Sequence, residues 1–585
     1  MMREIAVRVG GAAGDGIASV GETLAKSFSR MGLHLFGINA YQSVIRGGHV
    51  WFQARAATER VYTQGDGCDI LFALNKETAD VHLPSLRQGG TVIADPEKFA
   101  IPADQIPVRT HLLAVPTLAI ARKYTSQSIL QNAAGLGAAA FLSGIPLEVL
   151  QNALSDSFGK KKGEVVDWNL GAAKEGYEFA QKNSAASDHA VAAAGPPKMV
   201  MTGNQAIALG AAAAGCKFLS QYPMTPASTI MHWMAAHSKQ LGVVVKQAED
   251  ELAAINMAIG ASFGGVRAMT ATSGGGFSLM VEALGMSGMT EVPLVVVESQ
   301  RSGPSTGLPT KTEQGDLNMM LGAGQGEFPR AILAPAQPSE AFEDAVTAFR
   351  LAEEYQTPIL LASDFHLSES IATVEPEEIQ LDVDVPSLFT VTPNGDGYKR
   401  YRYTDSGVSP RSLPGQPGLQ YVAGSDEHDE AGHLISDTKS GIPIWVAERK
   451  KMMDKRMRKL AGLLKETPGP RVEGPDPAAV TIVAWGSTVS AVRDAMPLLS
   501  ERGVPTRLIQ VRTVYPVHGD EIRSLLAGAP RTLLVEANFS GQLGRLLRAE
   551  AGIEFPDKLL KYDGEPFYPM EIVAKVMEMM GHVGS

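Results

Sequence analysis

Cysteine is almost missing from this chain of 585 residues, which contains only Cys68 and Cys216. Two cysteines so far apart in the sequence provide neither a disulfide framework nor a CxxC ligand set. A [4Fe-4S] cluster needs four cysteine thiolates. The sequence therefore excludes such a cluster held by this chain alone.

Positive charge is also scarce, because 52 Lys and Arg face 63 Asp and Glu, for a net charge of −11. Binding to nucleic-acid phosphates requires clustered basic side chains. Residues 1–11 lack a basic region followed by an apolar core, and the longest apolar stretches are too weakly hydrophobic to cross a bilayer. We therefore expect no nucleic-acid partner, no membrane contact and a cytoplasmic location.

Glycine and proline, in contrast, are abundant, with 60 and 35 residues that often follow short apolar runs. This pattern is typical of strands that turn into helices, and it favours the α/β class. The chain is too long for a single hydrophobic core. We therefore expect an α/β protein with several doubly wound domains.

Changes in composition divide the chain into five segments. The second is small, polar and ends in proline, and the fourth is rich in Pro, Gly, Asp and Arg and ends in a basic helix. The other three alternate helical patterns with apolar strand candidates, among them 70–74, 91–95, 111–115, 267–272 and 358–363. We predict α/β domains over 1–185, 199–374 and 476–585, a linker over 186–198 and an irregular insertion over 375–475.

The most informative local motif is QYPMTPAST, residues 221–229. Two prolines three positions apart disfavour a helix and restrict the backbone, so that Thr225 is presented from a rigid loop. A hydroxyl held in this way can bind a substrate carboxylate. A structural turn in which Thr225 caps a helix is the alternative.

A second motif, QAEDELAAINMAIGASFGG at 247–265, places Glu249, Asp250 and Glu251 before a helix of small residues. Acidic side chains in a first helical turn complement the helix dipole, which accounts for two of the three. We expect the third to point into an interface. There, desolvation would raise its pKa and let it share a proton with a ring nitrogen.

Four motifs in one order resemble the pyrimidine-binding domain of the 2-oxoacid:ferredoxin oxidoreductases: YPMTP (222–226), EDELAAINMAIGA (249–261), MTATSGGGFSLM (269–280) and VPLVVVESQRSGPSTGLPTKTEQGDL (292–317). The resemblance implies that Glu251 hydrogen-bonds N1′ of the thiamine aminopyrimidine. Thr225 and Arg301 would hold the 1-carboxylate of the substrate. The other implied cofactor contacts are Tyr222, Pro223, Ser273, Gly274, Gly275 and Phe277. For the SGGG run, a tight strand–helix connection is the alternative.

Thiamine enzymes hold the diphosphate through magnesium with a GDG that is followed by an Asn-Asn pair. GDG occurs here at 14–16, 65–67 and 395–397, and no such pair follows. The resemblance therefore implies a partner, the beta subunit, that supplies the diphosphate site, the Mg ion and the [4Fe-4S] cluster. The expected assembly is (alpha-beta)2.

The amino-terminal segment carries GGAAGDG (10–16), which is only a weak variant of a dinucleotide fingerprint. YQSVIRGGHVWFQ (41–53) instead resembles the gamma domain of the same family, a domain that takes part in coenzyme A binding. Arg46, Gly47 and Gly48 become candidates for contacting coenzyme A. A glycine turn with a solvated Arg46 is the alternative.

The remaining segments carry weaker signals. His428 lies among four carboxylates in the insertion, where it would bind a metal, act as an acid or base, or lie in a solvated loop. AWGST (484–488) and VEANFSGQLGRLL (535–547) resemble the transketolase-type third domain of the family.

The resemblance as a whole implies an alpha subunit with a fused gamma domain. Its reaction would be the oxidative decarboxylation of a 2-oxoacid with coenzyme A, with electrons passed to ferredoxin, or the reverse carboxylation. The fused architecture and STGLPTKTEQGDL favour 2-oxoglutarate by family analogy. Pyruvate, branched-chain and aryl 2-oxoacids are the alternatives, as is a non-catalytic coenzyme A-binding assembly subunit.

Overall fold

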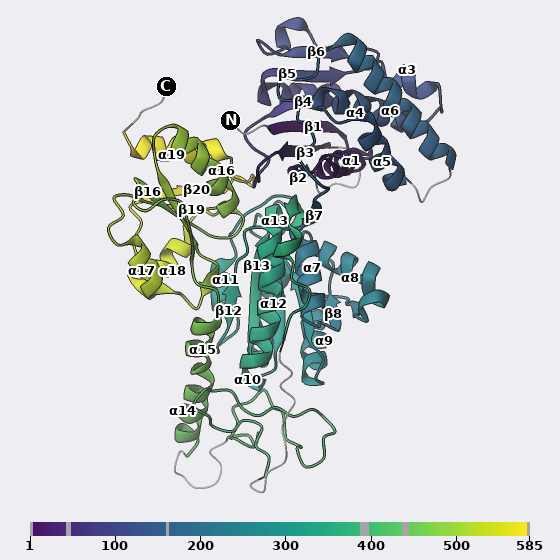
Figure 1. Cartoon of the computed structure of the whole chain (residues 1–585). Helices are drawn as coiled ribbons and strands as arrows, with labels where there is room; N and C mark the ends of the chain where they lie inside the picture. Colours follow the sequence, from purple (N-terminus) through teal and green to yellow (C-terminus); the bar gives the residue numbers. More distant parts are fainter. Residues whose placement is uncertain (1–3, 43–47, 159–162, 386–396, 436–443, 582–585) are drawn as a thin grey trace.

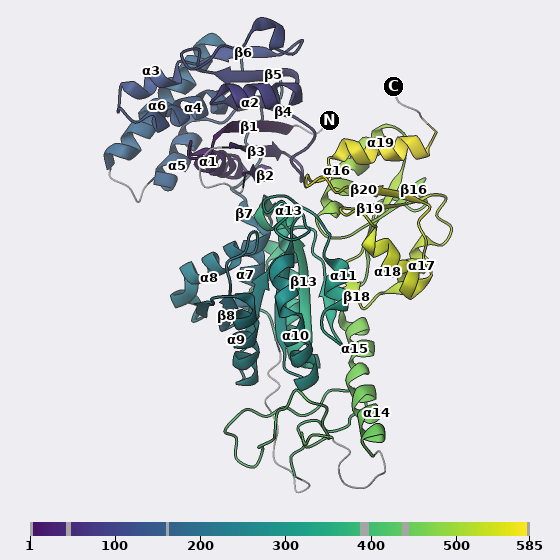
Figure 2. The same cartoon turned by 180° about the vertical axis from the view of Figure 1, so that it is seen from behind.

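The computed structural model describes residues 4–42, 48–158, 163–385, 397–435 and 444–581. These ranges form three β-sheets of eight, seven and five strands. Figures 1 and 2 show the first sheet and its helices at one end of the molecule, the second sheet in the middle and the insertion at the opposite end. The α/β class is confirmed.

The first sheet has the strand order β6-β5-β4-β1-β3-β2-β14-β7. The apolar runs expected to be strands at 70–74, 91–95 and 111–115 lie in β4, β5 and β6. The sheet is mixed, because β1 pairs in parallel with β4 but antiparallel with β3. Its strands from the first segment are β1 (Glu4–Ala12), β2 (His34–Ala40), β3 (His49–Ala57), β4 (Cys68–Ala73), β5 (Leu86–Ala94) and β6 (His111–Ala114).

Two strands from the predicted 199–374 domain complete the first sheet. β14 (Ile371–Val374) pairs antiparallel with β2 and with β7 (Met199–Thr202). These strands belong to the range 199–374, so hydrogen bonding continues across the predicted boundary at residue 199. The five-segment division stays a prediction about the chain.

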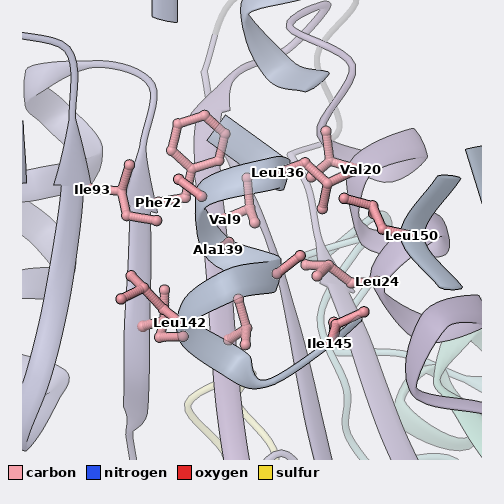
Figure 3. Packing of buried hydrophobic residues seen from close by; sticks show 14 of the residues in the cluster. Val9, Val20, Leu24, Phe72, Ile93, Leu136, Ala139, Leu142, Ile145 and Leu150 are labelled. Atoms are coloured by element: carbon pink, nitrogen blue, oxygen red, sulfur yellow. The ribbon is translucent and has the colours of Figure 1, made fainter. Parts of the chain in front are cut away.

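Helices cover the first sheet on the face shown in Figure 3, where Val9, Leu24, Phe72 and Leu136 meet in one hydrophobic core. Helices α4 and α6 approach closely, because a Cβ added at Gly176 would lie 2.6 Å from the Ala134 carbonyl carbon. The helices of this segment are α1 (Ile17–Arg30), α2 (Lys76–His82), α3 (Thr117–Arg122), α4 (Gln131–Ser143), α5 (Leu147–Phe158) and α6 (Gly163–Asn183).

The predicted linker contains no helix or strand between residues 184 and 198, but its backbone is bonded to the first domain. Ser187 N–H donates to the Leu142 carbonyl at 3.0 Å, and Ala194 N–H donates to the Met31 carbonyl at 2.8 Å. Val191 is buried in the same core. The segment is therefore attached along its length to the domain that it leaves.

The second sheet has the order β18-β12-β13-β11-β10-β8-β9, and all of its neighbouring strands except β18 are parallel. β18 (Thr513–Tyr515) comes from the third domain and pairs antiparallel with β12. The parallel strands are β8 (Phe218–Gln221), β9 (Val244–Gln247), β10 (Ala268–Thr272), β11 (Leu294–Gln300), β12 (Ala331–Leu333) and β13 (Pro358–Asp364).

Both faces of the second sheet are covered, as expected for a doubly wound domain. One core contains α7 (Gly203–Ala213), α8 (Ser228–Leu241) and α12 (Pro338–Tyr355). The other core contains α9 (Glu251–Phe263), α10 (Gly274–Thr290), α11 (Leu317–Gly322) and part of the third domain. The second and third domains therefore share a hydrophobic core.

The third sheet has the order β15-β17-β16-β19-β20. Its strands are β15 (Arg471–Glu473), β16 (Val480–Ala484), β17 (Thr506–Gln510), β19 (Thr532–Glu536) and β20 (Asp557–Leu560). Its helices are α16 (Thr488–Glu501), α17 (Gly519–Leu526), α18 (Gln542–Ala551) and α19 (Pro569–Met579).

The insertion ends in two helices, α14 (Ile444–Met457) and α15 (Lys459–Glu466), where the sequence pattern predicts one. Lys455 and Lys459, on either side of the break, bond the carboxylate of Glu291 at 2.5 and 2.7 Å. All three side chains are buried. Both lysines thus bond one buried carboxylate, which anchors the insertion to the second domain. Among the described residues, no helix is both long and apolar enough to cross a membrane.

Candidate functional site at the edge of the second sheet

The predicted site residues gather at one edge of the second sheet. Thr225 follows β8, Glu251 follows β9, Ser273 follows β10 and Arg301 follows β11. The carboxyl ends of parallel strands meet at the same edge, which is where open α/β sheets bind ligands. Parallel pairing thus brings together four motifs that are far apart in the sequence.

Glu251 is the buried acid of the three. Its residue is 3 % exposed, whereas Glu249 is exposed and Asp250 caps α9 by accepting a bond from Ala253 N–H at 2.7 Å. The Thr272 hydroxyl donates to Glu251 Oε1 at 3.5 Å. Burial raises the pKa of Glu251 above its ordinary value. The expectation that one acid of the run is desolvated is confirmed.

The glycine turn after β10 leaves room for Glu251. A Cβ added at Gly276 would lie 2.7 Å from Glu251 Cδ and still closer to Oε1. At Gly275, an added Cβ would meet only Met224 Cε, at 4.0 Å. Gly276 is therefore required for close packing against the carboxylate, while Gly275 faces open space.

Two neighbours of this turn differ in their surroundings. Ser273 is fully buried, and its hydroxyl has no hydrogen-bond partner among the described residues. Phe277 is buried in the core with Met280 and Leu284. Ser273 thus offers a polar atom that a bound group can satisfy, and the role of Phe277 as a cofactor contact stays a prediction.

Thr225 and Arg301 lie together. Arg301 Nη1 donates to the Thr225 carbonyl at 2.8 Å, although 76 residues separate them. Helix α8 begins at Ser228, and Ala227 at its N-cap position makes no side-chain cap bond. The alternative that Thr225 caps this helix is therefore wrong. Tyr222 and Pro223, in the same loop, are exposed.

Two further acidic residues beneath the site had only weak sequence signals. Glu298, in the middle of the apolar strand β11, is fully buried, and Asp316 lies beside Gly274. Burial and the neighbouring Asp316 carboxyl group raise the pKa of Glu298 well above its usual range, and burial raises the pKa of Asp316 to about 6. The one sequence signal for Glu298 was an acidic residue inside the apolar run VVVESQ (295–300).

Within the 41–53 motif at the first sheet, the structure describes residues 41–42 and 48–53. The Gly48 carbonyl accepts a bond from Ala13 N–H at 3.1 Å, so the 41–53 motif contacts the 10–16 glycine loop. Gly48 has a φ of 83°, which glycine adopts at little cost. Arg46 and Gly47 lie outside the described residues.

His428 is buried, so the expectation of a solvated loop is wrong for this side chain. Its ring centroid lies 3.8 Å from that of Tyr401, and burial lowers its pKa. Within the described ranges, no group of three or more His, Cys, Asp or Glu side chains is arranged to hold a metal ion. His428 packs within the fold of the insertion.

Three family models match the chain. Residues 209–443 match the thiamine-diphosphate-binding domain of pyruvate flavodoxin/ferredoxin oxidoreductases, and residues 6–179 match the pyruvate ferredoxin/flavodoxin oxidoreductase domain. Residues 472–549 match the transketolase C-terminal domain. These matches define a thiamine-diphosphate-binding oxidoreductase chain.

Comparison with whole proteins is more specific. The alpha subunit of a 2-oxoacid:ferredoxin oxidoreductase from a Sulfolobus species is 32% identical over 98% of this chain and 96% of its own length. The 2-oxoglutarate oxidoreductase subunit KorA of Mycobacterium tuberculosis is 30% identical over 98% of this chain and 91% of its own. The chain therefore belongs to the alpha subunits of the 2-oxoacid:ferredoxin oxidoreductases.

A solved structure covers almost the whole fold. The 2-oxoglutarate:ferredoxin oxidoreductase from Magnetococcus marinus, with 2-oxoglutarate, coenzyme A and succinyl-CoA bound, is 35% identical with a TM-score of 0.91. The match covers 98% of this chain and 99% of that one. The predicted family membership is confirmed along the full length.

Proposed function

We propose that this chain is the alpha subunit of a 2-oxoglutarate:ferredoxin oxidoreductase. The reaction converts 2-oxoglutarate, coenzyme A and oxidised ferredoxin to succinyl-CoA, carbon dioxide and reduced ferredoxin, and it is reversible. The KorA relative and the Magnetococcus marinus structure with these ligands support 2-oxoglutarate as the substrate. Pyruvate or a branched-chain 2-oxoacid is the alternative, because identity to these proteins is only 30–35%.

The observation that carries the proposal is the environment of Glu251. Its carboxyl group is buried, and Thr272 is its one side-chain hydrogen-bond partner among the described residues. The unpartnered Ser273 hydroxyl and the open space at Gly275 lie at the start of the adjoining helix α10. These features fit the aminopyrimidine ring of thiamine diphosphate, which has polar ring atoms and flat faces.

Thiamine diphosphate, when bound, supplies the carbanion chemistry that a 2-oxoacid decarboxylation requires. The role of Glu251 is to hold a proton at N1′ of the pyrimidine ring. Burial raises the pKa of Glu251, so its carboxyl group holds a proton more readily than an exposed glutamate does, which suits exchange of a proton with a ring nitrogen.

Thr225 and Arg301 would orient the 1-carboxylate of the substrate. The bond from Arg301 to the Thr225 carbonyl fixes the guanidinium beside the Thr225 residue. A guanidinium has five N–H donors, more than that bond uses. A carboxylate between the two residues would accept charge-assisted hydrogen bonds, which hold the 2-oxo carbon in a defined position.

Exposed apolar side chains on the elements that carry the site are consistent with an interface to a partner subunit. Tyr222, Leu252 and Leu279, which belong to the loop after β8 and to helices α9 and α10, are all more than a third exposed. Apolar side chains grouped on a surface indicate a protein interface. We propose that a beta subunit covers this surface and holds the diphosphate, the Mg ion and the [4Fe-4S] cluster. The assembly would be (alpha-beta)2, with ferredoxin as the electron partner and coenzyme A bound by Arg46, Gly47 and Gly48.

Substitution of Glu251 tests the proposal in the complex with the beta subunit. Glu251→Gln is expected to lower 2-oxoglutarate-dependent viologen reduction at least 10²-fold, because a glutamine amide cannot exchange a proton with N1′ of the pyrimidine ring. Glu249→Gln, at the exposed acid two residues earlier, is the matched control and is expected to keep activity. Size-exclusion chromatography checks that both variants still assemble.

Two results would contradict the proposal. Full activity in an assembled Glu251→Gln complex would exclude the cofactor role and favour a scaffold without catalytic function. Faster turnover of pyruvate or of branched-chain 2-oxoacids than of 2-oxoglutarate, with the same complex, would exclude the proposed substrate.

A further inference from the structure

The loop between β8 and α8, residues 222–227, carries Thr225 and has no regular secondary structure. Tyr222 and Pro223 are exposed, Thr225 is half-buried and Pro226 is buried. Both prolines lack an N–H group, so the loop has more backbone acceptors than donors. Its shape therefore depends on the groups that bond its carbonyls.

Three successive carbonyls at the end of this loop accept hydrogen bonds from side chains on β8, on α7 and after β11. These bonds run from Arg301 Nη1 to Thr225 at 2.8 Å, from Asn204 Nδ2 to Pro226 at 2.8 Å and from Gln221 Nε2 to Ala227 at 2.9 Å. Asn204 and Gln221 are fully buried. Hydrogen bonds in a low-dielectric interior are stronger than bonds exposed to water, so the backbone is held firmly at these carbonyls.

Asn204 uses both N–H groups of its amide to hold this region. Besides Pro226, its Nδ2 donates to Thr229 Oγ1, in the first turn of α8, at 2.7 Å. A carbonyl oxygen can only accept, so the nitrogen of the Asn204 amide faces Pro226 and the orientation of the amide is determined. The Thr229 hydroxyl then directs its own hydrogen to Glu369 Oε1 at 3.1 Å. Every donor in this chain of bonds therefore has a defined direction.

The two ends of the chain of bonds belong to helices that are in contact. Glu369 ends the short helix α13 (Phe365–Glu369), which lies beside α7 in Figures 1 and 2. A Cβ added at Gly203, one residue before Asn204, would lie 2.4 Å from the Leu367 carbonyl oxygen of α13. The backbones of α7 and α13 thus touch, and Asn204 and Glu369 are presented to Thr229 from a rigid base.

We infer that Asn204, Gln221 and Thr229 are positioning residues for the 2-oxoacid. They hold the backbone at the end of the loop, so that the Thr225 hydroxyl and the Arg301 guanidinium reach the 1-carboxylate of the substrate together. This inference rests on the proposed function, which assigns Thr225 and Arg301 to that carboxylate. Groups fixed before the substrate arrives lose little freedom on binding, which favours both affinity and turnover.

Thr229→Val tests the inference by steady-state kinetics of the complex with the beta subunit. The change removes the hydroxyl with little change in volume, so Asn204 loses one acceptor and Glu369 loses its donor. A misplacement of about 1 Å at a reacting centre costs about 10²-fold, and for this smaller loss of constraint we expect kcat/KM for 2-oxoglutarate to fall about tenfold. KM for coenzyme A should not change. Thr229→Ser keeps the hydroxyl and should restore kcat/KM.

A double-mutant cycle separates positioning from a general structural role. Thr225→Ala removes the hydroxyl that is to be positioned and should itself lower kcat/KM for 2-oxoglutarate. In this background Thr229→Val should lower kcat/KM much less than it does alone, because it acts through Thr225. If Thr229 only stabilised the fold, the two losses would multiply.

Thr357→Val is the matched control for the loss of a hydroxyl bond. The buried Thr357 hydroxyl donates to the Pro329 carbonyl near the amino ends of β13 and β12, at the opposite edge of the second sheet. The control should lower the free energy of unfolding as Thr229→Val does but leave kcat/KM unchanged. Gln221→Met, which keeps the volume and removes the bond to Ala227, gives an independent test if Thr229→Val fails to assemble. It should show the same selective loss of kcat/KM.

The result for Thr225→Ala separates this inference from the proposed function. If Thr225→Ala lowers kcat/KM but an assembled Thr229→Val or Gln221→Met complex is as active as the parent, the positioning role alone is overturned. Losses that multiply in the double variant, or an equal loss in Thr357→Val, overturn it as well. If Thr225→Ala leaves kcat/KM unchanged, the assignment of Thr225 to the substrate carboxylate fails, and the inference fails with it.

Discussion

We expect Gly276→Ala to lower the turnover of the complex much more than it lowers the free energy of unfolding. Gly276 lies in the first turn of α10, and a Cβ at this position would lie 2.7 Å from Glu251 Cδ. Carbon atoms are in optimal contact at about 3.5–4.0 Å, so Gly276→Ala must displace the Glu251 carboxyl group by about 1 Å. The added Cβ would also lie 2.1 Å from Thr272 Oγ1, so the hydroxyl that bonds Glu251 must move as well.

The effect of Gly276→Ala on the free energy of unfolding is smaller than its effect on turnover. Overpacking costs about 1–3 kcal/mol, which replacement of glycine by alanine in a helix offsets by about 1 kcal/mol. The free energy of unfolding should therefore fall by at most about 2 kcal/mol. A displacement of about 1 Å at a catalytic group lowers turnover by about 10²-fold, so activity should fall far more than stability.

Gly285→Ala in the same helix is the matched control. The atom nearest to an added Cβ at Gly285 is Phe328 Cε1, at an ordinary contact distance of 3.8 Å. The measurements are denaturant unfolding of the isolated chain and 2-oxoglutarate-dependent viologen reduction by the complex. If Gly276→Ala and Gly285→Ala complexes turned over equally fast, the inferred crowding at Glu251, and the role of its position, would be refuted.

Two other predictions concern buried charge. Burial raises the pKa values of Glu298 and Asp316, so the pair stabilises the fold below the unfolded pKa near 4, and this stabilisation is lost as pH rises through about 6 and above. Glu298→Gln should flatten this loss in pH-dependent unfolding, and an unchanged slope would exclude proton sharing. At Glu291, burial raises the pKa, but the charges of Lys459 and Lys455 outweigh it and hold the pKa well below its usual range. Glu291→Gln leaves both lysines without a buried counter-charge and should cost about 3–5 kcal/mol, visible as faster proteolysis of the insertion; wild-type protease resistance would contradict the anchor.

Local patterns predicted much of the fold and of the site. Short apolar runs bounded by glycine or proline predicted strands at 70–74, 267–272 and 358–363, and each is a strand in the structure. The small-residue helix after Glu251 predicted that one acid is desolvated. These features depend on residues close together in the sequence, where periodicity and turn chemistry act directly.

Other features depend on residues far apart. No local signal indicates that β7 and β14 complete the first sheet, that β18 joins the second, or that Lys455 and Lys459 share the carboxylate of Glu291. The proximity of the Glu298 and Asp316 carboxyl groups likewise joins distant segments, as do the bonds that link Glu369, Thr229, Asn204 and Pro226.

The sequence by itself determined the class of fold, the order of the motifs and the absence of cluster ligands, because these are properties of composition and short-range pattern. Only the tertiary structure decided which carboxylates are buried together, which strands complete each sheet and which glycine makes room for Glu251. Those properties arise from packing between distant segments, where burial and the neighbouring charges set the pKa and position of each side chain.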